Sequence, residues 1–261
     1  MRKRFLDLSF LLFIICSFNL LAINLPEKAN KVEDFIPKGW KKLVVKQGDL
    51  NKDKIDDVVL VIGKNDPKNI KKSESTYEAP ITNNFNPRII LVLFKDKNSQ
   101  YNLVAKNENG FIVSEGKSYE EGFEKLASPN LNGKLSDSIS IKNNTLHIYT
   151  YFEATRSSNS TEYIFRYQNN RFELIGLEAN ANGAGGGSIE NSNYSFNFST
   201  KKLKKYLSRE DMANEEKAKE EKTEKDIDIE NKYILDTMTE NTLEEILTEY
   251  VYNIITKKFN V

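Results

Sequence analysis

Short runs rich in β-branched and aromatic residues recur from Trp40 to Tyr206 and constrain the fold more than any other feature of the chain. Turns of Asn, Asp, Gly and Lys separate them, and many runs alternate apolar with polar residues, which is typical of strands with one buried face. We therefore expect a mainly β fold, an antiparallel meander built as a sandwich or as a partial, propeller-like set of strands, followed by a C-terminal helical segment. The clearest runs are residues 42–46, 58–62, 88–95, 101–106, 138–142, 145–153, 161–168, 172–178 and 194–199.

Two connections between these runs have the composition of tight hairpin turns. Asn143 and Asn144 join one pair of runs, and Asn169 and Asn170 join another. Asn tolerates a positive φ better than most residues do, and tight hairpins need that conformation. We expect one antiparallel β domain over residues 36–207.

Two segments interrupt this pattern. Residues 64–87 are rich in Lys, Asn, Ser and Glu and are too long for an ordinary turn, so we expect a mobile loop there. The glycine cluster at residues 182–188 follows a predicted strand, but neither a Lys-Ser/Thr pair nor a predicted helix follows it. A phosphate-binding loop requires both, which argues against a nucleotide site.

The C-terminal part, residues 208–261, changes to a Glu- and Lys-rich sequence. Ser208 and Asp211 have the spacing of a capping box, which marks the start of a helix. Oppositely charged side chains such as Glu221 and Lys225 would lie one helical turn apart. We therefore expect a charged, solvated helix in this region.

An apolar stripe near the C-terminus predicts a second, amphipathic helix, with Thr242 and Glu245 in the positions of another capping box. We expect the stripe to pack on the sheet of the same chain. Docking on a second protein, or on a second copy of this chain, is the alternative. The stripe consists of Leu243, Ile246, Leu247, Tyr250, Val251 and Ile254.

The N-terminus has the three parts of a secretory signal. Basic residues 2–4 precede an apolar run over residues 8–21, and Ala22 stands before a polar segment. We expect residues 1–22 to be a signal peptide, residues 23–35 to be a linker, and the protein to be exported: periplasmic, cell-surface or secreted. The apolar run is shorter than the roughly 20 residues of a comfortable membrane span, so membrane attachment would arise only through an uncleaved signal.

The cysteine and charge content excludes several classes of protein. The one cysteine, Cys16, lies within the predicted signal, so cleavage would remove disulfides, thiolate catalysis and Cys-ligated zinc from consideration. Lys plus Arg and Asp plus Glu both number 38, so no net field draws the protein to nucleic acid. We expect the partner to be a protein or an envelope polymer.

One acidic loop between two predicted strands has the spacing of a calcium site. Calcium takes roughly six to eight oxygen ligands, and acids or amides at every second position can turn their oxygens onto one centre. We expect the backbone carbonyl of Ile55 and water to complete the ligand set, with Asp56 pointing away. The expected side-chain ligands are Asp49, Asn51, Asp53 and Asp57.

The motif from Gly48 to Asp57, followed by an apolar strand, resembles the calcium motif of the FG-GAP and VCBS repeat proteins of bacterial exteriors. It is not an EF-hand, because Leu60 stands where a bidentate Glu is needed and the flanks have the pattern of strands. The chain also resembles a group of exported, uncharacterised bacterial proteins that have one such motif and a later stretch similar to residues 163–176. The resemblance covers roughly residues 36–206, and a single clear copy of the motif argues against a full propeller.

Lys54 departs from the pattern of that family, which usually has Gly at this position and often gives it a positive φ. Lys in that conformation costs on the order of 1 kcal/mol, and Lys52 and Lys54 together weaken the negative field of the loop. We therefore expect a weak calcium site, of the kind that fills outside the cell at dissociation constants of about 10⁻⁴ to 10⁻³ M. The alternative is a polar turn whose Asp and Asn side chains bond their own backbone.

The residues elsewhere favour a function other than catalysis. His147 is the only histidine, so a His-rich metal centre is excluded, and we expect it to be an ordinary strand residue. The expected function is an exported, non-enzymatic binding or structural module with a calcium-stabilised loop. The alternative is a hydrolase that acts on an envelope polymer through two carboxylates, and a pocket that holds paired acids away from the loop would support it.

Overall fold

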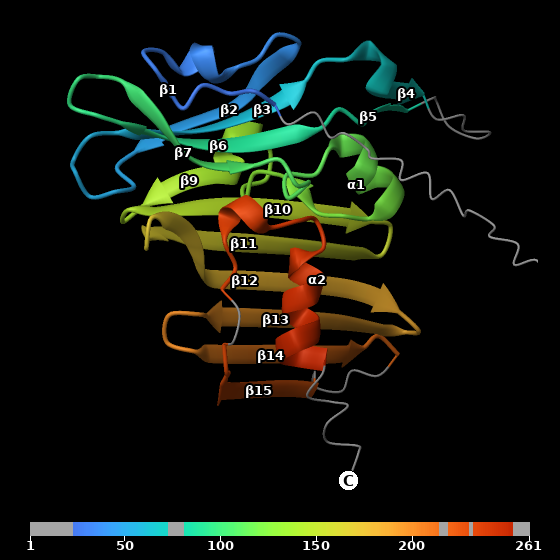
Figure 1. Cartoon of the computed structure of the whole chain (residues 1–261). Helices are drawn as coiled ribbons and strands as arrows, with labels where there is room; N and C mark the ends of the chain where they lie inside the picture. Colours follow the sequence, from blue (N-terminus) through green and yellow to red (C-terminus); the bar gives the residue numbers. More distant parts are fainter. Residues whose placement is uncertain (1–22, 73–80, 214–218, 230–231, 253–261) are drawn as a thin grey trace, which may run out of the picture.

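The structure is a computed structural model that describes residues 23–72, 81–213, 219–229 and 232–252. It confirms the mainly β fold: antiparallel strands form two principal sheets, and a short helix follows near the C-terminus. Figure 1 shows the smaller sheet above the larger one, whose strands descend to the lower edge. The predicted signal peptide, residues 1–22, lies outside the described part. No helix within that part is both long and apolar enough to cross a membrane.

The smaller sheet has five antiparallel strands in the order β1-β7-β6-β3-β2. Its central strands, β3 and β6, are buried along most of their length because both faces of this sheet are covered. Such strands are continuously apolar rather than alternating, as their sequences are. The strands are β1 (Lys28–Ala29), β2 (Trp40–Gly48), β3 (Asp57–Lys64), β6 (Arg88–Lys95) and β7 (Tyr101–Asn107).

The larger sheet has eight strands, in the order β15-β14-β13-β12-β11-β10-β8, with β9 also paired to β10. The strands from β9 to β15 follow one another in sequence and in space, which is the predicted meander. The strands are β8 (Lys125–Leu126), β9 (Ile139–Lys142), β10 (Thr145–Ala154), β11 (Ser157–Gln168), β12 (Arg171–Gly185), β13 (Ser188–Asn197), β14 (Lys202–Asp211) and β15 (Lys219–Asp226).

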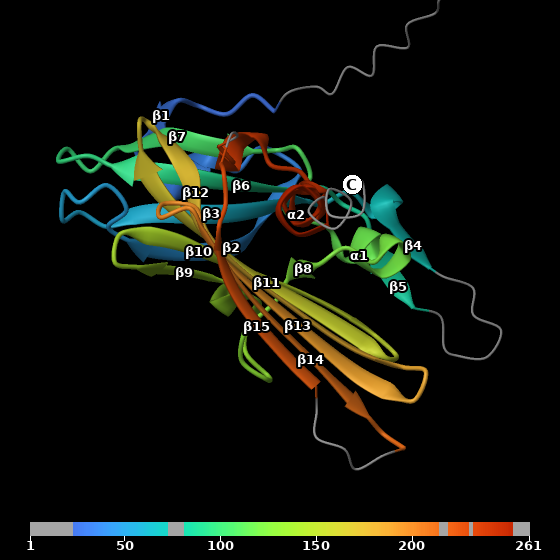
Figure 2. The same ribbon diagram turned by 90° about the horizontal axis from the view of Figure 1, so that it is seen from below.

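The helical elements are short. Figure 2 shows α1 and α2 on the same side of the larger sheet. The hydroxyl of Ser114 accepts a hydrogen bond from the Lys117 N–H and so caps α1, and Gly122, at a φ of 76°, ends it. The elements are α1 (Glu115–Glu121), α2 (Thr242–Leu247), its π-helical continuation η5 (Thr248–Tyr252), and the 3-10 helices η1 (Val32–Phe35), η2 (Pro67–Asn69), η3 (Leu135–Ser138) and η4 (Leu235–Thr237).

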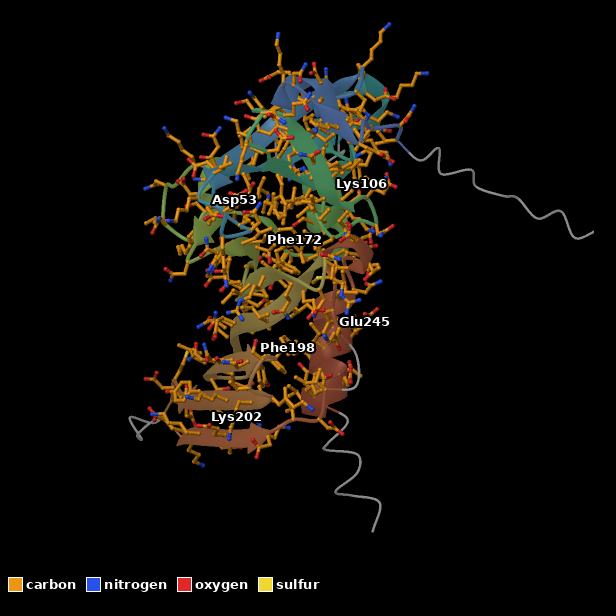
Figure 3. All side chains as sticks on the ribbon, turned by 60° about the vertical axis from the view of Figure 1, so that its left-hand side comes forward. Asp53, Lys106, Phe172, Phe198, Lys202 and Glu245 are labelled. Atoms are coloured by element: carbon orange, nitrogen blue, oxygen red, sulfur yellow. The ribbon has the colours of Figure 1, made fainter. Side chains whose placement is uncertain are left out.

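The main hydrophobic core lies between the two sheets and continues beneath α2. It joins Val59 and Val92 of the smaller sheet to Phe165 and Phe172 of the larger one, and it includes Ile246 of α2. In Figure 3, Phe172 lies where the two sheets meet. This shared core makes the arrangement sandwich-like near β9 to β12.

Both predicted hairpin turns are confirmed. Asn143 and Asn144 have φ values of 51° and 58° between β9 and β10, and Asn169 and Asn170 have 53° and 57° between β11 and β12. Positive φ at both central residues is the condition for a tight turn whose twist matches that of the strands. These turns set the register of the meander.

The prediction of a linker over residues 23–35 is wrong. Phe35 is fully buried and packs on the outer face of the smaller sheet with Leu60, Ile62 and Leu91. The segment also contributes β1, which pairs with β7. Local polarity suggested a linker, but the apolar outer face of the sheet requires a cover and this segment provides it.

The expected loop over residues 64–87 contains secondary structure in its described part. Strands β4 (Ile70–Lys72) and β5 (Thr82–Asn84) pair with each other, and η2 precedes them. The side-chain amide of Asn86, which is nearly buried, donates to the Asp66 carbonyl at 3.0 Å. A plain loop is therefore not what this segment forms, and residues 73–80 lie outside the described part.

The prediction of a charged helix from residue 208 is wrong as well. β14 continues to Asp211, and the Glu- and Lys-rich segment after it forms β15, the edge strand of the larger sheet. Lys202 pairs with Asp226 across these strands at 2.9 Å. Alternating charges support a helix or a solvated edge strand equally well, and antiparallel pairing with β14 makes this segment a strand. Residues 214–218 lie outside the described part.

The amphipathic helix near the C-terminus is present as α2 and η5. Ile246, Tyr250 and Val251 are buried in the main core, and Leu243 and Leu247 pack against it. The stripe thus packs on the sheet of its own chain; its last member, Ile254, lies outside the described residues. The capping box at Thr242 is wrong, because Asn241 is the N-cap and the Thr242 hydroxyl accepts from the Thr239 N–H instead.

Candidate functional site

The loop predicted to bind calcium connects β2 to β3 at one end of the smaller sheet; Figure 3 labels Asp53 there. Asp49 accepts hydrogen bonds from the N–H groups of Lys52, at 2.6 Å, and Lys54, at 3.0 Å. The carbonyl oxygen of the Asn51 side chain accepts from Asp53 at 2.9 Å. These contacts turn the polar side chains toward the backbone of their own loop.

Asp53 and Ile55 continue the same pattern. The Asp53 carboxylate accepts from the N–H of Ile55 at 2.8 Å and from the Asn51 side-chain amide at 3.1 Å. Lys52 and Lys54 have φ values of 71° and 68°. The predicted positive φ at Lys54 is therefore present, and Lys52 shares it.

Asp57 differs from the other predicted ligands because it is fully buried. Its two carboxylate oxygens accept from the N–H of Leu50 at 2.9 Å and from the N–H of Lys95 at 3.1 Å. Burial raises the pKa of Asp57 to about 6 against these two hydrogen bonds, and the charges of Asp53 and Asp49 raise the pKa further. Asp57 joins the start of its loop to the end of β6.

The loop is also attached to the larger sheet. The side-chain amide of Asn144, in the turn between β9 and β10, donates to the Asp49 carbonyl at 2.8 Å. Gly48 lies so close to Ile141 that an added Cβ would come within 2.9 Å of its side chain. The conformation of the loop therefore depends on both sheets.

In the arrangement that the structure shows, no group of three or more His, Cys, Asp or Glu side chains among the described residues is placed to hold a metal ion. The hydrogen bonds from the loop's own N–H groups to its Asp and Asn side chains are those of a polar turn, the alternative to a calcium site. The three aspartates are nevertheless close enough for their charges to interact, and within the described residues none of them forms an ion pair with a Lys or Arg side chain.

A second constellation, which the sequence did not predict, is centred on Glu124. The Thr150 and Thr161 hydroxyls both donate to its carboxylate, the latter at 3.0 Å. Burial raises the pKa of Glu124 to about 7, although both hydrogen bonds lower it. No motif selects this Glu among 38 acidic residues, because its partners are 26 and 37 residues away along the chain.

Glu124 lines a hollow of about 320 Å³ between the end of α1 and the start of α2. Phe111, Phe123 and Tyr163 form part of its wall. Glu240, also in the wall, forms an ion pair of 2.6 Å with Lys117. The wall of the hollow thus includes two carboxyl groups, those of Glu124 and Glu240, away from the β2–β3 loop.

His147 lies on β10, as expected of a strand residue. Its ring nitrogens are 2.9 Å from the Thr145 hydroxyl and 2.8 Å from a Glu162 carboxylate oxygen.

Comparisons with protein-family models, with curated proteins and with solved structures found no match.

Proposed function

We propose that the protein is a non-enzymatic binding module whose ligand surface is the open face of the larger sheet. The observation that carries this proposal is a hollow of about 340 Å³ whose described lining residues all belong to β10 to β14. The predicted signal peptide would place this surface outside the cytoplasm, where the expected partner is a protein or an envelope polymer.

Side chains alternate between the two faces of these strands, so the open face can be compared directly with the buried one. Tyr163, Leu177 and Tyr194 point to the core, where α2 and the smaller sheet cover them. Ser160 and Asn180 point the other way and are exposed or half-exposed. Antiparallel sheets commonly leave one face solvated, so this polar face takes no part in packing within the chain and is open to a ligand.

The proposal can be tested by sedimentation of the chain from residue 23 onwards with insoluble bacterial envelope material, before and after protease treatment of that material. We expect Asn180→Lys to abolish co-sedimentation, because a charge would be introduced into the hollow. Asn98→Lys, the same change in the exposed turn after β6, should bind as the wild type does. Equal retention of the two variants would contradict the proposal.

We further propose that calcium binds weakly in the β2–β3 loop and stabilises it. The support is the resemblance of the motif and the proximity of three carboxylates that no described basic side chain neutralises. Burial is the main cause of the raised pKa of Asp57, and a cation would remove the smaller repulsion from Asp53 and Asp49 that adds to it. Asp49, Asn51, Asp53, the carbonyl of Ile55 and Asp57 are the proposed ligands.

Thermal unfolding in calcium tests this second proposal. If the dissociation constant is about 10⁻⁴ to 10⁻³ M, 10 mM calcium should add roughly 1.4 to 2.7 kcal/mol and raise Tm by several degrees. Asp53→Ala should remove the rise, whereas Asp56→Ala, which changes an exposed neighbour, should keep it. An unchanged Tm of the wild type in 10 mM calcium would identify the loop as a polar turn.

A carboxylate-pair hydrolase is the second candidate function, and the hollow at Glu124 favours it. Glu124, whose pKa of about 7 keeps it largely protonated at slightly acidic pH, would be the acid, and Glu240 the second carboxylate. Release of reducing ends from envelope polysaccharide should then fall at least 100-fold in Glu124→Gln and stay unchanged in Glu120→Gln, an exposed change on α1 outside the hollow. No release by the wild type would dismiss this candidate.

A further inference from the structure

We infer that the open face of the larger sheet binds a linear, uncharged polysaccharide laid across strands β10 to β14. This inference rests on the proposed function and names the chemical class of its ligand. It is carried by the arrangement and chemistry of the described side chains that line the hollow, none of which is charged.

The side chains on this face form two rows that run across the strands. In the first row, Tyr151 is opposite Ser160, Ser160 opposite Asn180, Asn180 opposite Asn193, and Asn193 opposite Tyr206. The row therefore crosses five strands. At a strand spacing of about 4.8 Å it is roughly 19 Å long, which suits an extended oligomer better than a single small molecule.

The second row lies two residues farther along each strand toward the free ends of the hairpins. Its members are Ser158, Asn182, Asn191 and Ser208, each opposite the next. Cross-strand neighbours on one face lie within reach of each other, so the two rows form one continuous surface.

Hydrogen bonds within the rows hold the amides in place. Asn182 donates to Asn191 at 2.5 Å, and Asn191 donates to the Ser208 hydroxyl at 3.2 Å. In the first row, Asn193 donates to Asn180, which donates to the Ser160 hydroxyl at 3.4 Å.

Each of these amides still has hydrogen-bonding capacity for a ligand. An Asn side chain has two N–H donors and two acceptor lone pairs, and the bonds within the rows use only part of that capacity. Sugar hydroxyls both donate and accept, so they match a surface that presents both functions in a repeating order.

The described lining of the hollow offers no partner to a charged ligand; charged side chains lie at its two ends, Glu153 beside Tyr151 and Lys222 beside Tyr206. Of the residues of this chain, 29% are charged, yet the hollow contains only Tyr, Ser, Asn and Ala side chains. A charged polymer seated within the hollow would lose hydration without gaining an opposite charge from this lining. A neutral chain of hydroxyl groups avoids that penalty.

The two tyrosines at the ends of the first row add apolar contact. A Tyr ring combines a flat apolar surface with a polar hydroxyl and loses little conformational entropy on binding. The ammonium of Lys222 lies over one face of the Tyr206 ring, 5.0 Å from its centroid, and this cation–π contact helps to hold the ring in place. Sugar rings, which have apolar faces and polar rims, fit such a surface.

The test is isothermal titration of the chain from residue 23 onwards with cellohexaose, chitohexaose and maltohexaose, with a polygalacturonate hexamer as the anionic comparison. We expect at least one neutral hexamer to bind, its disaccharide to bind at least ten-fold more weakly, and the anionic hexamer not to bind. The affinity should change less than two-fold between 0.05 and 0.5 M NaCl, because screening does not act on uncharged ligands.

Asn180→Ala combined with Asn193→Ala should weaken the best hexamer at least ten-fold. Asn98→Ala is the matched control, and unchanged Tm values would show that both variants are folded. If no neutral hexamer binds while envelope material is still retained in a manner that depends on Asn180, the polysaccharide inference is wrong and the proposed function stands. If retention is independent of Asn180, both fail.

Discussion

Lys54 has a backbone conformation that favours glycine. Its φ of 68° lies in the left-handed region, where a side chain costs roughly 1 kcal/mol, and Asp49 holds it there by accepting its N–H. We expect Lys54→Gly to raise the free energy of unfolding by about 0.5 to 1 kcal/mol, measured by urea denaturation. Lys64→Gly, a control on β3 without a positive φ, should lower it instead. A loss of stability in Lys54→Gly would show that the lysine side chain stabilises the loop by a contact of its own.

Buried carboxyl groups make stability depend on pH. The folded pKa values of Asp57, about 6, and Glu124, about 7, lie above their unfolded values of 3.8 and 4.5. Each contribution is complete below the unfolded pKa and is lost as pH rises through the folded pKa. Stability should therefore fall from pH 5 to pH 8.

The share of this fall that belongs to Glu124 can be measured separately. Urea unfolding at pH 5, 6, 7 and 8 should show a smaller fall in Glu124→Gln than in the wild type, and an unchanged fall in Glu121→Gln, whose side chain is exposed. Identical profiles of Glu124→Gln and the wild type would contradict the raised pKa.

Glu173 acts in the opposite sense. Its pKa is lowered to about 2 by hydrogen bonds, among them those from Gln168 and Arg171, and the stability it contributes is lost only in acid.

At the scale of elements, the segment before β2 is a structural cover. Phe35 of η1 is fully buried against Leu60 and Leu91. We expect Phe35→Ala to cost about 3 to 5 kcal/mol, the range for a buried Phe that leaves a cavity. Glu33→Ala, an exposed change in the same 3-10 helix, should alter stability by less than about 0.5 kcal/mol in the same denaturation experiment. A small effect of Phe35→Ala would mean that the segment acts as the linker first expected.

Local sequence predicted some elements correctly and misjudged others, for a physical reason. The Asn-Asn turns were predictable because their φ values depend on the residues themselves. The charged segment that forms β15 was not, because its i,i+4 pairs satisfy a helix while its partners on β14 satisfy a strand. Lys205, for example, lies 3.6 Å from Glu221, a pairing that exists only once the hairpin has formed.

The whole molecule should unfold as one unit. The main core includes residues of both sheets and of α2, so neither sheet can lose its packing alone. Trp40, the only tryptophan, lies on β2 and reports on the smaller sheet, whereas far-ultraviolet circular dichroism reports on all strands. We expect the two signals to give coincident urea transitions. Separate midpoints would show that the sheets are independent domains.

The candidate sites were predictable to different degrees. The position of the acidic loop and the positive φ of Lys54 followed from the motif, because both depend on adjacent residues. The buried position of Asp57 did not, since its carboxylate accepts a hydrogen bond from Lys95, 38 residues away. Glu124 and the rows that cross β10 to β14 carried no motif, because their neighbours are set by register.

Features that depend on a few adjacent residues could be predicted from the sequence: the alternation of the strands, the tight Asn turns, the polar loop between β2 and β3 and the apolar stripe of the last helix. Three features became apparent only in the folded chain: which faces are covered, that the charged segment is a strand, and that Asn180 stands between Ser160 and Asn193. Burial and cross-strand pairing join residues far apart in the chain, and their energies exist only when the sheets have assembled.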